Sequence, residues 1–362
     1  MPFFELLQIA LGNQDSFSTV LSDKDWAKVY SESERQTVTG ILLQGIDKLP
    51  SEQRPLQALL LQWIGVGQMI EQRNNLMNSR CHELLEQLSS KGLQGSILKG
   101  QGIALLYNDD LRKLRQSGDI DVYVDCGLEK SLAFAEYVGQ QDIDWDYKHL
   151  HLNVWNDTKV EMHYRVEVLL NLRKNRQLQR WFKEHQDAVL GSRFKVHGGE
   201  IVTPTVEFNV FYILLHIYRH FLYEGIGLRQ IVDYYMVLCK VHDSQLRVQK
   251  YAEAVHEFGM EKFAKGLMWV MQKALGMPKE WMLWDPEKKE GEYILKQVME
   301  GGNFGHHDKR LDHKGGKVGA VKAILTHNLH LLTHYPSDTL WAPVWIVWHK
   351  VWKIKAKMCL TS

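Results

Sequence analysis

The sequence predicts an α+β fold, in which a small mixed sheet is flanked along the chain by two helical regions. Apolar residues recur at helical spacing before residue 92 and again after residue 201. Between these regions, short segments alternate apolar and polar residues, as strands with one buried face do. We therefore expect three parts: a helical N-terminal region (1–92), a sheet domain (93–200) and a helical C-terminal region (201–362).

The predicted sheet domain follows a simple order of elements. SILKG at 96–100 is a short apolar strand that ends in glycine, and IALLYNDDLRKL continues as a helix. DIDVYVD at 119–125 alternates, and LEKSLAFAEYVG is an amphipathic helix that stops at Gly139. KHLHLNVW and KVEMHYRV alternate again around the turn residues Asn156 and Asp157, which predicts a hairpin.

The rest of the chain is expected to be helical from about residue 166. The stretch from Thr203 to Gly225 begins with a cap residue and a first-turn proline. Further helices are expected at 228–241, 250–275 and 317–335, followed by a tryptophan-rich end.

Composition limits the class of protein. The chain is 45% hydrophobic and 24% charged, with a net charge of +1, so neither a coat for nucleic acid nor a disordered chain is indicated. A local basic groove for nucleic acid stays open. Four widely spaced cysteines suit a reducing compartment, and Glu5 interrupts the apolar N-terminal run, which argues against a secretory signal. The expected location is cytoplasmic.

Two carboxylates on one face of a strand are the main functional signal. Asp119 and Asp121 are two residues apart, so they project from the same side of the strand, away from Ile120 and Val122. Carboxylates that close repel each other unless a cation lies between them. Glu161, on the second strand of the hairpin, is placed to add a third acid and shares its face with His163. Such a set favours Mg²⁺, with two ions for in-line phosphoryl or nucleotidyl transfer.

The segment before the aspartates fits a phosphate. Lys99 and Gly100 end a strand and open a helix, where backbone amides and the helix dipole favour an anion. Arg115, Ser117 and Gly118 come directly before Asp119 and are candidates for the same phosphates.

These motifs resemble the polymerase-β-type nucleotidyltransferase superfamily, and within it the bacterial uncharacterised nucleotidyltransferase family. The resemblance lies in LKG, a helix, R-x-S-G-D-I-D-V-Y-V and an acidic residue two before a histidine on a later strand. It covers about residues 93–165, and extends loosely to 235 through His216, His220 and GLRQIVDYYMVL.

The resemblance implies transfer of a nucleoside monophosphate from an NTP to an acceptor hydroxyl or other nucleophile. It implies that Asp119 and Asp121 hold the metal and that Glu161 is the third acid, which positions or deprotonates the acceptor. Gly100 matches the glycine of the phosphate turn. Lys-Gly stands where the superfamily has Gly-Ser, so a serine contact to phosphate would come from Ser96 or Ser117.

Two other classes of function stay open. One is a nucleotide-sensing or regulatory module without turnover. The other is a membrane-surface or complex-assembly protein, in which the C-terminal helix would bind through Trp341, Trp345, Trp348 and Trp352 and the lysines that follow. Packing of this tryptophan stripe on the rest of the protein is the simpler interpretation, and we do not expect a membrane surface as a partner.

Other groups of polar residues have bland explanations. A rival acidic group has no glycine turn before it and is expected to be a solvated connection: Asp142, Asp144 and Asp146. A group of three histidines is expected to line a pocket more than to bind zinc: His149, His151 and His163. His216, His220 and Arg229 are candidate pocket residues, although Arg229 is also spaced to pair with Asp233. The basic residues of 165–183 read as a solvated helix face, and the histidines of the glycine-rich segment 301–316 read as a loop.

Overall fold

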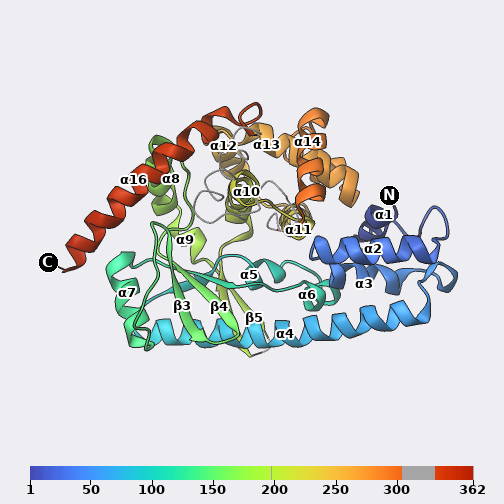
Figure 1. Cartoon of the computed structure of the whole chain (residues 1–362), viewed down its shortest axis with the longest axis horizontal. Helices are drawn as coiled ribbons and strands as arrows, with labels where there is room; N and C mark the ends of the chain where they lie inside the picture. The colour runs from blue at the N-terminus through green and yellow to red at the C-terminus, as the bar shows by residue number, and fades with distance from the viewer. Residues whose placement is uncertain (197, 304–330, 362) are drawn as a thin grey trace, which may run out of the picture. The chain divides into compact units, whose positions relative to one another are not determined.

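The computed structural model describes residues 1–196, 198–303 and 331–361 (Figure 1). The chain forms two compact units. The first unit comprises Met1–Leu76, Ile103–Ser117 and Asn209–Asp312. The second comprises Met77–Gly102, Gly118–Phe208 and His313–Ser362. Each unit is thus assembled from three separate stretches of chain, whereas the sequence suggested three consecutive parts.

The first unit is helical in the part that the structure describes. Its helices are α1 (Pro2–Leu11), α2 (Asp23–Arg35), α3 (Thr39–Lys48), the first part of α4 (Gln57–Ser90), α6 (Asp109–Leu114), most of α10 (Val206–Tyr223), α11 (Leu228–Asp243), α12 (Gln249–Glu257), α13 (Glu261–Val270) and α14 (Lys288–Gly301). A 3-10 turn, η1 (Ser51–Gln53), follows α3, a π-helical turn, η2 (Met271–Leu275), extends α13, and a second 3-10 turn is η3 (Lys279–Trp281). The helical character predicted before residue 92, after Thr203 and at 228–241 is therefore confirmed, while the helix expected at 250–275 is divided into α12, α13 and η2.

Local chemistry explains where several of these helices begin. The Ser22 side chain accepts a hydrogen bond from the Asp25 amide at the start of α2, and Asn108 does the same for Leu111 in α6. At α10 the cap is Thr205, which accepts from Phe208 N, so the expected cap at Thr203 was placed two residues early. Inside the unit, Trp26 and Trp63 pack edge to face with ring centroids 6.1 Å apart.

The second unit is built on a four-stranded mixed sheet with strand order β1-β2-β4-β3. Its strands are β1 (Gly95–Ile97), β2 (Ile120–Val124), β3 (His149–Trp155) and β4 (Thr158–His163). The short helix α5 (Gln101–Ala104) follows β1, and α7 (Gly127–Tyr137) connects β2 to β3. Strands β2 and β4 are parallel, while the other two pairings are antiparallel.

One face of this sheet is apolar and packs against the later part of α4. Ile120, Val122, Val160 and Met162 are all at most 1% exposed. A side chain at Gly95 of β1 would collide with Leu85 and Leu88 of α4, which shows how closely helix and sheet approach. The opposite face consequently carries the charged and imidazole side chains of β2, β3 and β4, whereas Thr158 lies on the apolar side and contacts Arg80 and Met77 of α4.

A two-stranded hairpin corrects the expectation that the chain is helical throughout after residue 166. β5 (Ser192–Val196) pairs with β6 (Gly199–Thr203) after helices α8 (Leu172–Glu184) and α9 (Gln186–Val189). Its strands are short and carry Arg193 and Lys195 on an exposed side, so the segment looked like charged helix or loop. Gly198 and Gly199 have positive φ and supply the turn.

The last described helix is α16 (Pro336–Thr361), while the expected helix at 317–335 lies mostly outside the described residues. Among the helices that the structure describes, none is long and apolar enough to cross a membrane.

Candidate functional site

The two central strands of the sheet bring Asp121 and Glu161 together. β2 and β4 run parallel, and Asp121 stands directly opposite Glu161 in the register. Both side chains leave the face opposite the packed one, because Ile120, Val122, Val160 and Met162 fill the apolar side. Asp121 is 2% exposed, so its carboxylate needs close partners.

Lys99 is the first of these partners. Leu98 N donates to Asp121 O at 2.9 Å, which continues the β1–β2 pairing and directs the next residue toward the site. Lys99 Nζ lies 2.9 Å from Asp121 Oδ1. Burial disfavours the ammonium, but Asp121 and Asp119 outweigh it and raise the pKa of Lys99. The lysine is therefore a permanent cation of the site.

His163 is the second partner and bridges two acids. Its Nε2 lies 3.0 Å from Asp121 Oδ1 and 3.3 Å from Glu161 Oε2. Burial lowers the pKa of His163, but the hydrogen bonds to the two carboxylates prevail, and the net pKa is raised. Its buried Nδ1 has no hydrogen-bond partner among the described residues.

The pKa values of the three acids shift in different directions. Asp121 raises the pKa of Asp119, and burial adds to this effect. For Asp121, burial acts upward, but Lys99 and the hydrogen bond from His163 lower the net pKa. The pKa of Glu161 is likewise lowered, since the hydrogen bond from His163 and the charge of Lys99 outweigh burial. Asp121 and Glu161 are thus held ionised, while for Asp119 the attraction of Lys99 does not offset the repulsion by Asp121 and the effect of burial.

This donor set fits a hard divalent cation. Ligand atoms of Asp121, Glu161 and His163 all lie within 4.8 Å of one another. Carboxylate oxygens are the ligands that Mg²⁺ prefers, and the raised pKa of Asp119 reflects negative charge that a cation would relieve. Lys99 and His163 are the side chains that would have to share the carboxylates with such an ion.

A second group on the same sheet face comprises His149, His151 and Glu161, again within 4.8 Å. Both histidines come from β3, and His149 Nε2 is 3.9 Å from Glu161 Oε2. Burial and the neighbouring His163 lower the pKa of His149 to about 4, so its imidazole is neutral near pH 7. The three histidines expected on one sheet face do lie there together.

The expected phosphate turn has one clear structural feature. Gly100 has φ of +57°, a left-handed conformation that favours glycine, and a Cβ there would make ordinary van der Waals contact with Asp119 O at 3.5 Å. The helix that follows, α5, has only four residues, which makes its dipole weaker than the sequence suggested. Ser96 is buried and donates to Val189 O, while Ser117 Oγ has no partner among the described residues.

Arg115 belongs to the first unit, and there it is bound to Asp233. Its Nε and Nη2 each lie 2.7 Å from a carboxylate oxygen of Asp233, and the Tyr107 hydroxyl donates to the same group. Asn74 Nδ2 holds the Arg115 carbonyl. The guanidinium is nearly fully buried, so its observed role is to fasten α11 to the segment before Ser117.

The candidate pocket residues His216, His220 and Arg229 are also in the first unit. The two histidines are buried on α10 with ring centroids 4.3 Å apart, and Arg229 Nη1 donates to Gln116 O. Their part in a substrate pocket stays a prediction.

Sequence reasoning missed a buried ion pair in the second unit. Lys148 Nζ lies 3.3 Å from Glu167 Oε1, and both side chains are almost inaccessible. Lys148 also acts electrostatically on His149 and His163, so it belongs to the surroundings of the site. The available signal was Glu167 itself, a lone acid inside the apolar run VEVLL.

The remaining polar groups are placed as follows. Asp146 accepts from the amides of Lys148 and His149 and so shapes the turn before β3, while Asp142 and Asp144 are exposed. Exposed basic residues of α8 form a charged face. The histidines of segment 301–316, His306, His307 and His313, lie outside the described residues.

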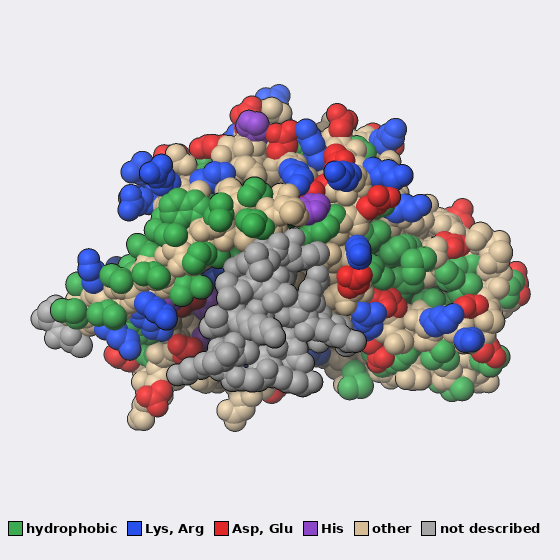
Figure 2. All heavy atoms as spheres, turned by 45° about the horizontal axis from the view of Figure 1, so that its top comes forward, with side chains coloured by type: hydrophobic (Ala, Val, Ile, Leu, Met, Phe, Trp, Pro, Cys, Tyr) green, Lys and Arg blue, Asp and Glu red, His purple; other side chains and the backbone are tan. Residues whose placement is uncertain are grey.

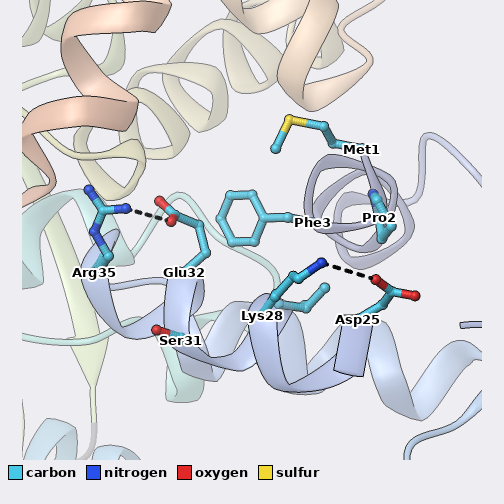
Figure 3. A pocket seen from close by; sticks show the side chains of 9 residues that line it. Met1, Pro2, Phe3, Asp25, Lys28, Ser31, Glu32 and Arg35 are labelled. Atoms are coloured by element: carbon cyan, nitrogen blue, oxygen red, sulfur yellow. Dashed lines mark hydrogen bonds and ion pairs between the residues drawn. The ribbon is translucent and has the colours of Figure 1, made fainter. Parts of the chain in front are cut away.

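A separate pocket of about 490 Å³ occurs in the first unit between α1 and α2 (Figure 3). Phe3 points into it from α1, and its charged lining residues pair with each other, Lys28 with Asp25 and Arg35 with Glu32. It contains none of the residues expected in the site, and its charges are already compensated.

One comparison with known proteins gives a match. A family model described as "Uncharacterised nucleotidyltransferase" matches residues 22–276. Curated proteins and solved structures give no significant match. The match extends over more than half of the chain, including all four strands of the main sheet. The chain therefore belongs to the uncharacterised nucleotidyltransferase family.

Proposed function

We propose that the protein transfers a nucleoside monophosphate from an NTP to an acceptor hydroxyl or other nucleophile. The bond between the α-phosphorus and the bridging oxygen breaks, a bond from the acceptor to that phosphorus forms, and pyrophosphate leaves. The observation that carries the proposal is Asp121 opposite Glu161 on two parallel strands, with Asp119 beside them.

Asp119, Asp121 and Glu161 are the residues that would hold Mg²⁺, with the two aspartates shared between two ions. Bound there, Mg²⁺ would neutralise phosphate charge and activate the attacking and leaving oxygens. The short distances between ligand atoms of Asp121, Glu161 and His163 support the assignment of Asp121 and Glu161. Asp119 is not a member of that group, and its assignment is supported by its electrostatic interaction with Asp121 and Glu161.

Glu161 has the role of an orienting ligand more than that of a base. Its lowered pKa keeps it ionised, as a ligand must be, but makes it a weak proton acceptor. His163 fixes Asp121 and Glu161 relative to each other by contacting both. It is therefore a positioning residue of the proposed site.

Lys99, Gly100 and Gly118 are the proposed phosphate contacts from the second unit. Lys99 carries a permanent charge, and Gly100 keeps the turn open for close approach of the backbone. Ser117 remains a candidate because its hydroxyl has no partner among the described residues. Arg115 acts in this proposal by anchoring the chain before Ser117, since Asp233 holds its guanidinium.

The test uses the full chain with each of the four NTPs labelled on the α-phosphate, Mg²⁺ and a fractionated cell extract as the acceptor source. We expect label transfer and pyrophosphate release with at least one NTP. Asp121→Asn should lower turnover by at least about a hundredfold, because a lost metal ligand removes several kcal/mol of charge stabilisation. Asp142→Asn, at an exposed aspartate, is the matched control and should keep full activity.

Failure would be unambiguous in this design. If wild-type protein binds no NTP in the presence of Mg²⁺ by calorimetry, or if Asp121→Asn and Asp142→Asn behave alike, the proposal is rejected. Thermal unfolding of both variants shows whether any loss reflects the fold.

A second candidate is a nucleotide-binding module without turnover. The observation in its favour is that the Lys99 ammonium and His163 already compensate Asp121, which a purely binding site could use in place of a metal. NTP binding that is independent of Mg²⁺ and gives no pyrophosphate would support this candidate over transfer.

A further inference from the structure

Helix α16 packs on the sheet domain through its tryptophans. The rings of Trp345, Trp348 and Trp352 lie 5.5, 4.9 and 4.9 Å from the ring of Tyr147. Trp352 also meets Trp145 edge to face, and the Arg165 guanidinium covers Tyr147. The tryptophan stripe is therefore a contact within the second unit, as the simpler interpretation of the sequence suggested.

A second apolar stripe on α16 faces solvent. It consists of aliphatic residues with exposed fractions between 46% and 65%, namely Leu340, Val344, Val347, Val351 and Ile354. Their intervals of four, three, four and three place them within an arc of about 80°, roughly 110° from the tryptophans. Figure 2 shows hydrophobic side chains gathered along this side of the molecule, with lysine or arginine groups between them.

This stripe differs from ordinary exposed apolar residues by its regularity. Single exposed leucines or methionines need no explanation, and Leu61 and Met69 of α4 are of this kind. A continuous stripe along four turns of a helix marks an interaction surface. The tryptophan contacts hold the helix on the protein, so the aliphatic side remains available for a partner.

The charges on α16 indicate which kind of partner the aliphatic stripe would bind. The one acidic residue of α16 is Asp338 in its first turn, whereas Lys350, Lys355 and Lys357 are exposed and Lys353 pairs with Asp144 of the sheet domain. A second copy of the helix in parallel orientation would bring lysines against lysines, which disfavours a parallel homodimer through this face. An anionic lipid surface offers an apolar layer for the stripe and phosphates for the lysine ammonium groups. The alkyl stems of the lysines can lie along the apolar layer while their ammonium groups stay at the phosphates.

We propose that α16 docks the protein on the surface of a bilayer that contains anionic phospholipid. The helix lies in the plane of the interface, with the aliphatic stripe at the boundary of headgroups and acyl chains and lysines on the lipid phosphates.

The test is co-sedimentation of the full chain with two kinds of vesicle, phosphatidylcholine alone and phosphatidylcholine with about a third phosphatidylglycerol. We expect binding to the anionic vesicles and little to the neutral ones. Val347→Asp/Val351→Asp should lower the partition coefficient at least about tenfold, and Lys350→Gln/Lys355→Gln by about tenfold on anionic vesicles only.

The matched control is Leu61→Asp/Met69→Asp, which places the same charges at exposed apolar positions of α4 and should leave vesicle binding unchanged. Unaltered binding by Val347→Asp/Val351→Asp, or equal binding to neutral vesicles, overturns the proposal. So does a dimer in analytical ultracentrifugation that Val347→Asp/Val351→Asp converts to monomer, because the stripe would then contact a second copy. Thermal unfolding confirms that each variant is folded.

Discussion

Lys99 has two possible partners, the carboxylate of Asp121 and a phosphate of the nucleotide. Its ammonium now pairs with Asp121, at 2.9 Å, yet it lies directly before the turn proposed to receive phosphate. As the partner of Asp121 it competes with any cation for that carboxylate. As a phosphate ligand it would increase affinity for the nucleotide.

Lys99→Met separates these two effects because they have opposite signs. We expect affinity for Mn²⁺ alone to rise, and affinity for a non-hydrolysable NTP with Mg²⁺ to fall, each by about tenfold or more, the size of one charge-assisted hydrogen bond. Calorimetry with each ligand measures both. Lys159→Met, at an exposed lysine of β4, serves as the control, and a fall in both affinities would show that Lys99 does not compete with the ion.

Arg115 is expected to contribute to the stability of the fold. We expect Arg115→Ala to lower the free energy of unfolding by about 3–5 kcal/mol, because Asp233 would stay buried without its cation. Denaturant unfolding measures the loss. Arg193→Ala, which breaks the exposed pair with Glu200, should cost no more than about 1 kcal/mol.

If Arg115 instead contacts a phosphate, its substitution should affect NTP affinity and not stability. If Arg115→Ala keeps its stability but loses NTP affinity, the guanidinium contacts phosphate, and the sequence expectation is restored.

At the scale of elements, the turn between β1 and α5 is the part most sensitive to backbone geometry. Gly100→Ala should destabilise the protein by about 1–2 kcal/mol, since φ of +57° is costly for alanine, and should also weaken NTP binding. Gly92→Ala is a close control, because Gly92 has φ of +71° and open space around it. Both variants should lose similar stability in denaturant unfolding, and only Gly100→Ala should lose affinity in calorimetry. Equal NTP affinity in the two variants would exclude this turn from the site.

For the whole molecule, the strands of the main sheet were predictable because their signals are local. Alternation marks β2, β3 and β4, whereas Asp119, expected on the same strand as Asp121, lies directly before β2. The parallel pairing that sets Asp121 opposite Glu161 depends on a contact across 40 residues of chain, which no local pattern encodes.

Other features escaped prediction for related physical reasons. Arg115 meets Asp233 across 118 residues, and the partner of a charge so far away cannot be inferred from spacing. The hairpin of β5 and β6 is short and partly charged, so its alternation resembled a polar segment. The aliphatic stripe of α16 became meaningful only once the tryptophans were seen to pack on Tyr147.

The charge inventory around Asp121 has a consequence for the order in which ligands arrive. Three carboxylates, Asp119, Asp121 and Glu161, stand near the Lys99 ammonium and the His163 imidazole, and both of these groups contact Asp121. A bare divalent ion would have to displace Lys99 before it could bind Asp121. A triphosphate that already carries its ion can draw Lys99 toward its own oxygens and expose Asp121 in the same event. Nucleotide and metal would therefore enter together, and the fold would not depend on either.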